Sequence, residues 1–201
     1  MTAVTPPGWA EALLRTVLPR RDRETVSGDL LEEYRMHVVP ARGRSAADGW
    51  YLRQVACFVW RSQVGWAIAL SVIFVGRTAI DWLVPTTDFH VRSAVTTYAS
   101  VAVLVTAGAV AAWRSHAIVA GAIAGASVAI IAAAFDLMAS IVMLGFFHDA
   151  ATLAAAEQSG GIAEVFTLPF ILIVPATVLG LLGGLPAAVR HFLPGSHSST
   201  G

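Results

Sequence analysis

The residues of this sequence with the clearest chemical potential are four ionisable side chains in or beside long apolar segments. Arg77, Asp81 and Asp136 lie within such segments, and Glu164 lies at the outer end of the last one. A charge at the centre of a membrane helix costs about 2.5–3.5 kcal/mol, so charges there usually pair, face the inside of a bundle or mark a pathway. We interpret the four residues either as a structural ion-pair cluster or as a site for a ligand, an ion or a proton.

Helix geometry places these charges close to one depth. At 1.5 Å rise per residue, Arg77, Asp81 and Asp136 lie about 20, 26 and 29 Å from the start of their segments, in the outer third of a bilayer. Arg77 and Asp81 are four residues apart, so they share a helix face and can form an ion pair. We expect Asp136 to reach Arg77 from its own helix. No row of acids continues inward, so the sequence does not predict a full proton relay.

The sequence contains none of the common catalytic or metal-binding patterns. It has no Gly-rich phosphate loop, no His-x-x-x-His pair with a helical Glu, no pair of cysteines and no Gly-x-Ser-x-Gly. His148 and Asp149 stand alone, and two residues do not make a metal site. Cys57 is interpreted as an apolar filler, since free cysteine behaves as a small hydrophobe. We therefore predict a protein that is not an enzyme and has no catalytic residues, metal or cofactor.

The segments that hold these charges are predicted to be membrane helices. Of the 201 residues, 56% are hydrophobic and 13% are charged, whereas a soluble domain usually carries about 25% charged residues. Each long apolar segment reaches the roughly 20 residues needed to cross a ~30 Å hydrocarbon layer. The four segments cover residues 64–84, 94–113, 117–147 and 162–189.

The charged residues lie mostly ahead of these segments. Nine of the 13 arginines and seven of the 13 acids fall in residues 1–61. The sequence therefore predicts an all-α integral membrane protein. It would have a small cytoplasmic helical head over 1–61, a bundle of four transmembrane helices over 62–192, and a disordered tail over 193–201.

The placement of arginine predicts the orientation of the chain. With both termini in the cytoplasm, Arg114, Arg190 and the nine arginines of the head are cytoplasmic, and Arg92 is external. This distribution follows the positive-inside rule. All basic residues are arginine and alanine is abundant, as in GC-rich bacterial genes. The first twenty residues lack the apolar run of a signal peptide, so we expect the first membrane helix to direct insertion. The prediction is a multi-pass protein of the bacterial cytoplasmic (inner) membrane.

The head is predicted to contain three helices. The first covers 9–18 and ends at Pro19, and the second runs from a cap at Asp22 to about residue 37. A turn is expected at 40–43, and a third helix, capped by Ser45, should continue into the membrane without a break. A head of about sixty residues buries little surface, so we expect its stability to depend on the membrane or on a partner.

The head also presents a surface of mixed charge. We interpret it either as a solvated face attracted to anionic lipid, at about 1 kcal/mol per arginine, or as a face that docks a protein partner. The chain has no net charge, so direct binding to nucleic acid is not predicted. The candidates for partner docking are Arg20, Arg21, Arg23, Asp29, Glu32 and Glu33.

Small residues and prolines predict how the helices pack. Residues 121–125 (GAIAG) and 180–184 (GLLGG) have small side chains four apart, which lets helix backbones approach closely. These motifs are interpreted either as packing within one chain or as a homodimer interface. Pro169 and Pro175 are expected to kink the fourth segment.

Four blocks of the head resemble a known domain: WAEALLR at 9–15, LPRRDRE at 18–24, GDLLEEYR at 28–35 and WYLRQ at 50–54. The order and spacing of these blocks make residues 8–61 resemble the permease-prefix domain that precedes some bacterial MacB/FtsX-like permeases. Less closely, the head is similar to helical modules on small multi-span proteins that are paired with PadR-like repressors. The resemblance implies a cytoplasmic helical head whose partner is a PadR-like regulator or a permease subunit.

These observations lead to two functional hypotheses. The first is a non-enzymatic accessory or signalling protein, anchored in the lipid bilayer, whose head docks a cytosolic partner. The alternative is a component of an export permease system that associates with other membrane subunits.

Overall fold

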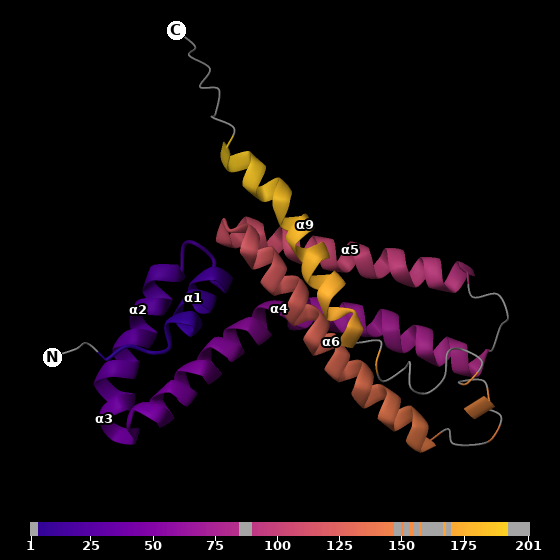
Figure 1. Ribbon diagram of the computed structural model, residues 1–201, viewed down its shortest axis with the longest axis horizontal. Helices are drawn as coiled ribbons and strands as arrows, with labels where there is room; N and C mark the ends of the chain where they lie inside the picture. Colours follow the sequence, from indigo (N-terminus) through magenta and orange to yellow (C-terminus); the bar gives the residue numbers. More distant parts are fainter. Residues whose placement is uncertain are drawn as a thin grey trace, which may run out of the picture.

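The chain folds into helices, as a computed structural model shows (Figure 1). The structure describes residues 4–84, 90–146, 150, 153–154, 157, 167 and 170–192. The regular elements over the described residues are all helical, which confirms the predicted all-α class. They are α1 (Gly8–Val17), α2 (Arg23–Glu33), the π-helix η1 (Tyr34–Val38), α3 (Val39–Arg42), α4 (Arg44–Leu83), α5 (His90–Ser115), α6 (Ile118–Phe146) and α9 (Ile173–Phe192).

Three of these helices are long and apolar enough to cross a membrane. They are the α4 segment Arg44–Asp81, with 38 residues, α5 with 26 and α6 with 29. The apolar part of α9, Ile173–Pro186, is shorter. Residues 162–166, the start of the expected fourth segment, lie outside the described residues, as do the tail residues 193–201.

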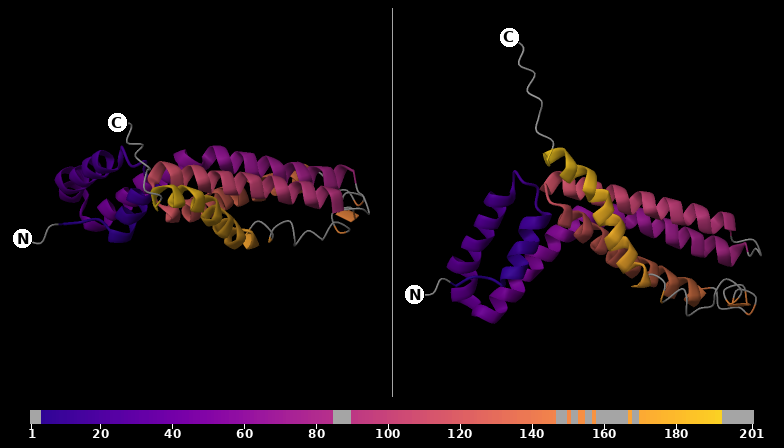
Figure 2. Two further views of the ribbon diagram at one scale, coloured as in Figure 1. Left: turned by 90° about the horizontal axis from the view of Figure 1, so that it is seen from above. Right: turned by 45° about the horizontal axis from the view of Figure 1, so that its top comes forward.

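The N-terminal helices pack around a small core of their own, and we call α1 to α3 with the first part of α4 the head. Tyr34 of η1 and Tyr51 of α4 meet edge to face, with ring centroids 5.9 Å apart. Figure 2 shows these helices grouped beyond one end of the long helices. The buried residues of this core are Ala10, Leu14, Leu18, Tyr34, Val38, Ala47, Tyr51 and Val55.

The first two helices begin close to where the sequence predicts. α1 begins and ends one residue earlier than the expected helix at 9–18, and its buried side chains are Ala10 and Leu14. α2 begins directly after Asp22, but the Asp22 side chain makes no capping hydrogen bond. Its carboxylate instead accepts a hydrogen bond of 3.3 Å from Arg21 Nε. Asp22 therefore occupies the predicted N-cap position, but its side chain does not cap the helix.

The turn expected at 40–43 is wrong. The chain stays helical from Tyr34 to Arg42, because Pro40 lies in the first turn of α3, where a missing N–H costs little. The direction changes at Gly43, whose φ of 76° is a conformation that glycine adopts easily. α4 begins directly after Gly43, so Ser45 does not cap it.

A single helix of 40 residues, α4, links the head to the bundle. Its N-terminal part contributes Tyr51 and Val55 to the head core, and Ala67 and Leu70 belong to the core of the long helices. The prediction that the third helix continues without a break is confirmed. α4 is therefore part of both the head and the bundle.

Glycines bring α9 into backbone contact with α5 and α6. A Cβ atom on Gly125 of α6 would lie closer than 3.0 Å to the carbonyl oxygen of Ala176, and one on Gly183 would meet the carbonyl oxygen of Val105 equally closely. Figure 1 shows α9 crossing α5 obliquely and running beside α6. The small-residue motifs at 121–125 and 180–184 therefore pack against each other within one chain.

The helix is interrupted just ahead of Pro175, as predicted. Residues 170–171 are helical, the chain turns at Leu172, and α9 begins at Ile173, so Pro175 lies in its first turn. The proline inside α9 is Pro186, near its C-terminal end. Pro169 lies outside the described residues.

The stability of the head is expected to depend on pH in the alkaline range, because of Tyr34. Its hydroxyl donates a hydrogen bond of 2.6 Å to Asp48 Oδ1, and burial together with this carboxylate raises the pKa of Tyr34 from 10.0 to about 12. A raised folded-state pKa means that the stabilisation is complete below pH 10.0 and is lost as the pH rises through about 12. We expect near-ultraviolet circular dichroism of the full chain to show thermal unfolding of the head at lower temperature at pH 11.5 than at pH 8.

Two variants test this assignment. Tyr34→Phe should reduce the alkaline loss, with a remainder from Tyr51, whose pKa burial also raises. Tyr98→Phe is the matched control, since Tyr98 is 75% exposed on α5. An unchanged alkaline loss in Tyr34→Phe would show that another group controls it.

Candidate functional site

A charged cluster lies where α4 ends and α5 begins. Arg77 Nε donates to Asp81 Oδ2 at 3.3 Å, so the predicted ion pair is present. Arg92 Nη1 donates to Asp81 Oδ1 at 3.1 Å. The Asp81 side chain is only 9% exposed. One buried carboxylate is therefore shared by two guanidinium groups.

Arg92 is the member of this cluster that sequence reasoning missed. The apolar segment at 94–113 places Arg92 in an external loop, ahead of the predicted helix. α5 begins at His90, which brings Arg92 into its first turn and within reach of Asp81. Arg92 Nη1 also donates to the carbonyl oxygen of Val84 at 2.8 Å, which fixes its position. Among the described residues, two arginines and one aspartate give this cluster a net charge of +1.

Asp136 is buried in α6 but stays outside this cluster. It is 5% exposed, and its Oδ1 atom has no hydrogen-bond partner in the structure. No ion pair joins it to Arg77 among the described residues, so the expected contact between the two is wrong. Glu164, the fourth predicted member, lies outside the described residues.

A cavity of about 480 Å³ between α4, α5, α6 and α9 contains both Arg77 and Asp136 in its wall. α5 contributes a row of hydroxyl side chains that are three or four residues apart and therefore lie on one face of the helix. Sequence reasoning also missed this row, although its spacing is visible in the sequence. Ser100 Oγ in this row is buried without a hydrogen-bond partner. The polar wall consists of Arg77, Ser93, Thr96, Thr97, Ser100 and Asp136.

The wall of the cavity offers polar groups that can bind a ligand. Its hydroxyls donate and accept hydrogen bonds, and its two charges have opposite sign. No group of three metal-binding side chains occurs in the part of the chain that the structure describes. Apolar side chains complete the wall, among them Leu70, Phe74, Leu104, Pro175 and Leu179.

Two of the six predicted docking residues contact the bundle. Arg23 Nη2 donates to the carbonyl oxygen of Ser115 at 2.9 Å, and the backbone N–H of Arg20 donates to the carbonyl oxygen of Arg114 at 3.1 Å. These carbonyls belong to the last two residues of α5, next to the tight turn that leads to α6. The head therefore rests on this turn, in addition to its covalent link through α4.

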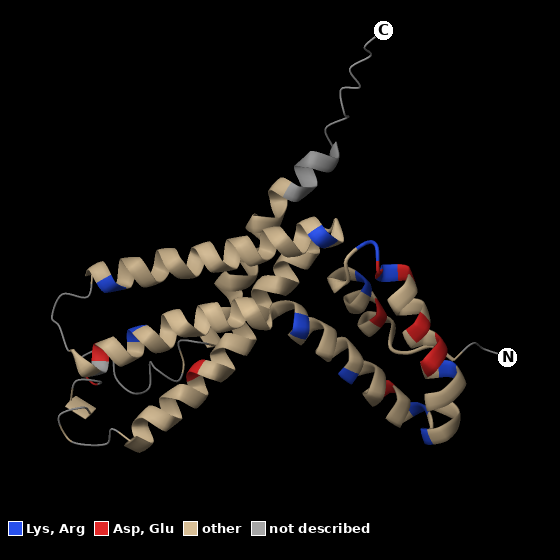
Figure 3. Ribbon diagram, turned by 180° about the vertical axis from the view of Figure 1, so that it is seen from behind, with Lys and Arg blue, Asp and Glu red and all other residues tan. Residues whose placement is uncertain are grey.

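The other four docking candidates are on the outside of the head. The Arg21 side chain is 87% exposed and pairs with Asp22. Asp29, Glu32 and Glu33 are exposed on α2. Figure 3 shows that charged residues concentrate on the head, with few along the long helices.

The contact of Arg23 with Ser115 should hold the head in place. We expect Arg23→Ala to speed hydrogen exchange in residues 18–24 of the purified full chain, because the contact with the α5–α6 turn is lost. Arg21→Ala is the matched control, since its exposed side chain makes no contact with that turn. Equal exchange in the two variants would contradict a role for Arg23 in docking the head.

Comparison with known proteins finds no relative of this chain. No protein-family model, curated protein or solved structure matches the chain. Its function has to be inferred from the helices, the cavity and the surface of the head.

Proposed function

We propose that this chain is a non-enzymatic accessory or signalling protein of the bacterial cytoplasmic membrane. In this proposal α4, α5, α6 and α9 cross the bilayer and the head docks a cytosolic protein. Three helices have the length and composition for crossing, and large apolar side chains cover their outward faces. Surfaces of this kind favour contact with lipid. Among the exposed side chains are Val72, Val95, Val119, Ile141 and Val174.

The positions of the arginines support a cytoplasmic head. The head touches the α5–α6 turn through Arg20 and Arg23, so both lie at the same end of the long helices. Arg114 lies at this turn, and nine further arginines belong to residues 1–61. The positive-inside rule therefore assigns this end to the cytoplasm.

The observation that carries the proposal is the continuity of α4. One helix contributes Tyr51 to the head core, Leu70 to the bundle core and Arg77 to the cavity wall. A change at the cavity that shifts α4 would therefore change the position of the head. A signalling role requires two distinct sites and an element with two arrangements that both sites bias, and we propose α4 as that element.

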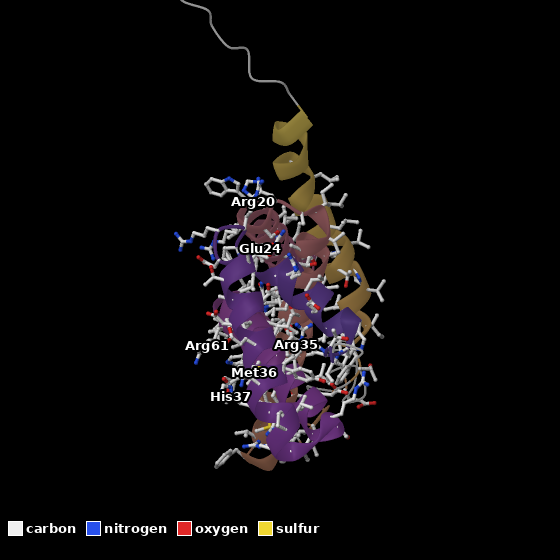
Figure 4. All side chains as sticks on the ribbon, turned by 90° about the vertical axis from the view of Figure 1, so that its left-hand side faces the viewer. Arg20, Glu24, Arg35, Met36, His37 and Arg61 are labelled. Atoms are coloured by element: carbon white, nitrogen blue, oxygen red, sulfur yellow. The ribbon has the colours of Figure 1, made fainter. Side chains whose placement is uncertain are left out.

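The outward face of the head is the proposed docking surface. Met36 is 66% exposed beside Glu33 and His37, whose Oε2 and Nδ1 atoms lie 3.2 Å apart. Figure 4 shows Arg35, Met36 and His37 together at the end of the head that faces away from the bundle. An exposed methionine among charges suits a protein interface. Because the head resembles the permease-prefix domain and modules paired with PadR-like repressors, we propose a PadR-like regulator or a permease subunit as its partner.

Photo-crosslinking in cells tests the docking surface. A photoreactive amino acid at Met36 of the full chain should capture one cytosolic protein, and Glu32→Arg with Glu33→Arg should abolish the capture. The same amino acid at Val119, which is 61% exposed on α6, is the control and should meet lipid. A product at Met36 that survives both charge reversals would contradict docking through this face.

The second candidate, a component of an export permease, is favoured by a groove between α4 and α6. The groove is lined by Ile68, Val72, Val75, Gly76 and Phe135, together with Ser71, and a Cβ on Gly76 would meet no atom within 4 Å. Small residues at an open helix surface let another membrane helix approach. A photoreactive amino acid at Val72 that captured a membrane protein, with no capture at Met36, would favour this candidate.

A further inference from the structure

We propose that the cavity between α4, α5, α6 and α9 binds a small zwitterion with an apolar body, its ammonium group at Asp136 and its anionic group at Arg77. The inference rests on the proposed signalling function and supplies the chemistry of the signal. The cavity volume of about 480 Å³ falls within the roughly 300–1,000 Å³ of small-molecule sites.

The ammonium end follows from the state of Asp136. This residue is 5% exposed, and its Oδ1 atom is buried without a hydrogen-bond partner. Its neighbours in the cavity wall include Ala132 and Ala133, which offer no donor. Buried polar atoms are nearly always partnered, and a buried carboxylate needs an opposite charge. An ammonium group supplies both, and Ser100 Oγ, which also lacks a partner, can accept a second of its protons.

The anionic end follows from the charge around Arg77. Its guanidinium is held by long hydrogen bonds, 3.3 Å to Asp81 and 3.4 Å to Ser93. Asp81 also neutralises Arg92, so the cluster keeps one positive charge. With Asp136 the charges of the described residues sum to zero, and a ligand that carries both charges preserves this balance. A ligand that is only a cation or only an anion would leave one buried charge uncompensated.

The apolar body would occupy the rest of the cavity, between Leu70 and Phe74 of α4, Leu104 of α5 and Leu179 of α9. Two kinds of molecule share this chemistry. One is a free amino acid with an apolar side chain, and the other is the headgroup of an ethanolamine phospholipid with its acyl chains directed outward. The experiment below separates the two sources.

Binding is measured on the purified full chain in phosphatidylcholine nanodiscs, because the choline ammonium has no proton to donate. The probes are phenylalanine, 2-phenylethylamine and 3-phenylpropionate, which share one ring and differ in charge. Isothermal titration calorimetry should show phenylalanine binding at least about tenfold more tightly than the other two, as expected for one additional hydrogen bond to a charged group. Equal or tighter binding of either singly charged probe would overturn the proposal.

Asp136→Asn should weaken phenylalanine binding by at least about tenfold. Ser140→Ala is the matched control, since Ser140 lies one turn further along α6, is 1% exposed and also has an unpartnered Oγ, but does not line the cavity. Circular dichroism checks that both variants fold. Binding that is unchanged in Asp136→Asn would place the ligand elsewhere and contradict the proposal.

Native mass spectrometry tests whether the ligand is a lipid headgroup. If the source is a lipid headgroup, the chain should retain one phosphatidylethanolamine in detergent, and Asp136→Asn should lose it. Failure of both phenylalanine and phosphatidylethanolamine to bind would contradict the inference. Photo-crosslinking at Met36 is independent of these probes, so the docking proposal and the ligand proposal can fail separately.

Discussion

Gly180→Ala is expected to lower the stability of the bundle by about 3 kcal/mol, at the upper end of the range for overpacking. A Cβ atom at Gly180 would lie 2.9 Å from both Cα and N of Gly125, and closer still to the carbonyl oxygen of Gly121. These are backbone atoms, which cannot turn aside as a flexible side chain can. The added methyl group should therefore push α9 away from α6.

The matched control for this change is Gly76→Ala on α4. A Cβ at Gly76 meets no atom within 4 Å, and alanine is favoured over glycine inside a helix by about 0.5–1 kcal/mol. The same chemical change should therefore destabilise at one position and be neutral or stabilising at the other. Thermal unfolding of the detergent-solubilised chain, followed by circular dichroism, measures both. Similar unfolding temperatures for the two variants would contradict the close approach of α6 and α9.

Asp81→Leu is expected to cost about 3–5 kcal/mol, because removal of one member of a buried ion pair leaves uncompensated charge. Two arginines, Arg77 and Arg92, would then face each other without their shared carboxylate. Arg77→Leu should cost less, since Arg92 still neutralises Asp81. The unfolding temperature of each variant, measured as for the glycines, gives the order of the effects.

Replacement of the whole cluster provides the control. The triple variant Arg77→Leu, Asp81→Leu, Arg92→Leu should recover most of the loss, because an apolar set of similar volume is often as stable as a buried ion pair. Asp136 is left unchanged, since it lies outside this cluster. A triple variant no more stable than Asp81→Leu would show that the arginines do more than balance Asp81.

Local sequence rules predict the helices well where one signal dominates. Apolar length and periodicity place α1, α5 and α6 within a few residues of their observed bounds. The rule that proline breaks a helix gives the wrong turn at Pro40, because a proline in the first turn of a helix is tolerated. Gly43, with its positive φ, is the residue that reverses the chain.

The candidate site is predictable only in part. The spacing of Arg77 and Asp81 determines their pairing, since residues four apart on a helix are neighbours. Whether Arg92 reaches Asp81 depends on the residue at which α5 begins, and no local sequence pattern indicates that residue. Asp136 has the expected depth, but α6 is apolar all round and rich in alanine, so its sequence does not indicate which side faces Arg77.

The membrane orientation of the head is tested most directly by labelling its own cysteine. Cys57 is the single cysteine in the sequence, and its thiol is exposed on the head. A membrane-impermeant maleimide should label Cys57 only after the cells are lysed. In a Cys57→Ala background, cysteine at Ser196 should behave the same way, whereas cysteine at Val91, which is 69% exposed at the start of α5, should react in intact cells.

This labelling pattern is expected if, as proposed, the chain crosses the membrane four times with both ends in the cytoplasm. Reaction of Cys57 in intact cells would contradict the cytoplasmic head. Protection of Cys57 combined with reaction of cysteine at Ser196 in intact cells would mean an odd number of crossings, and the four-helix membrane bundle would be wrong.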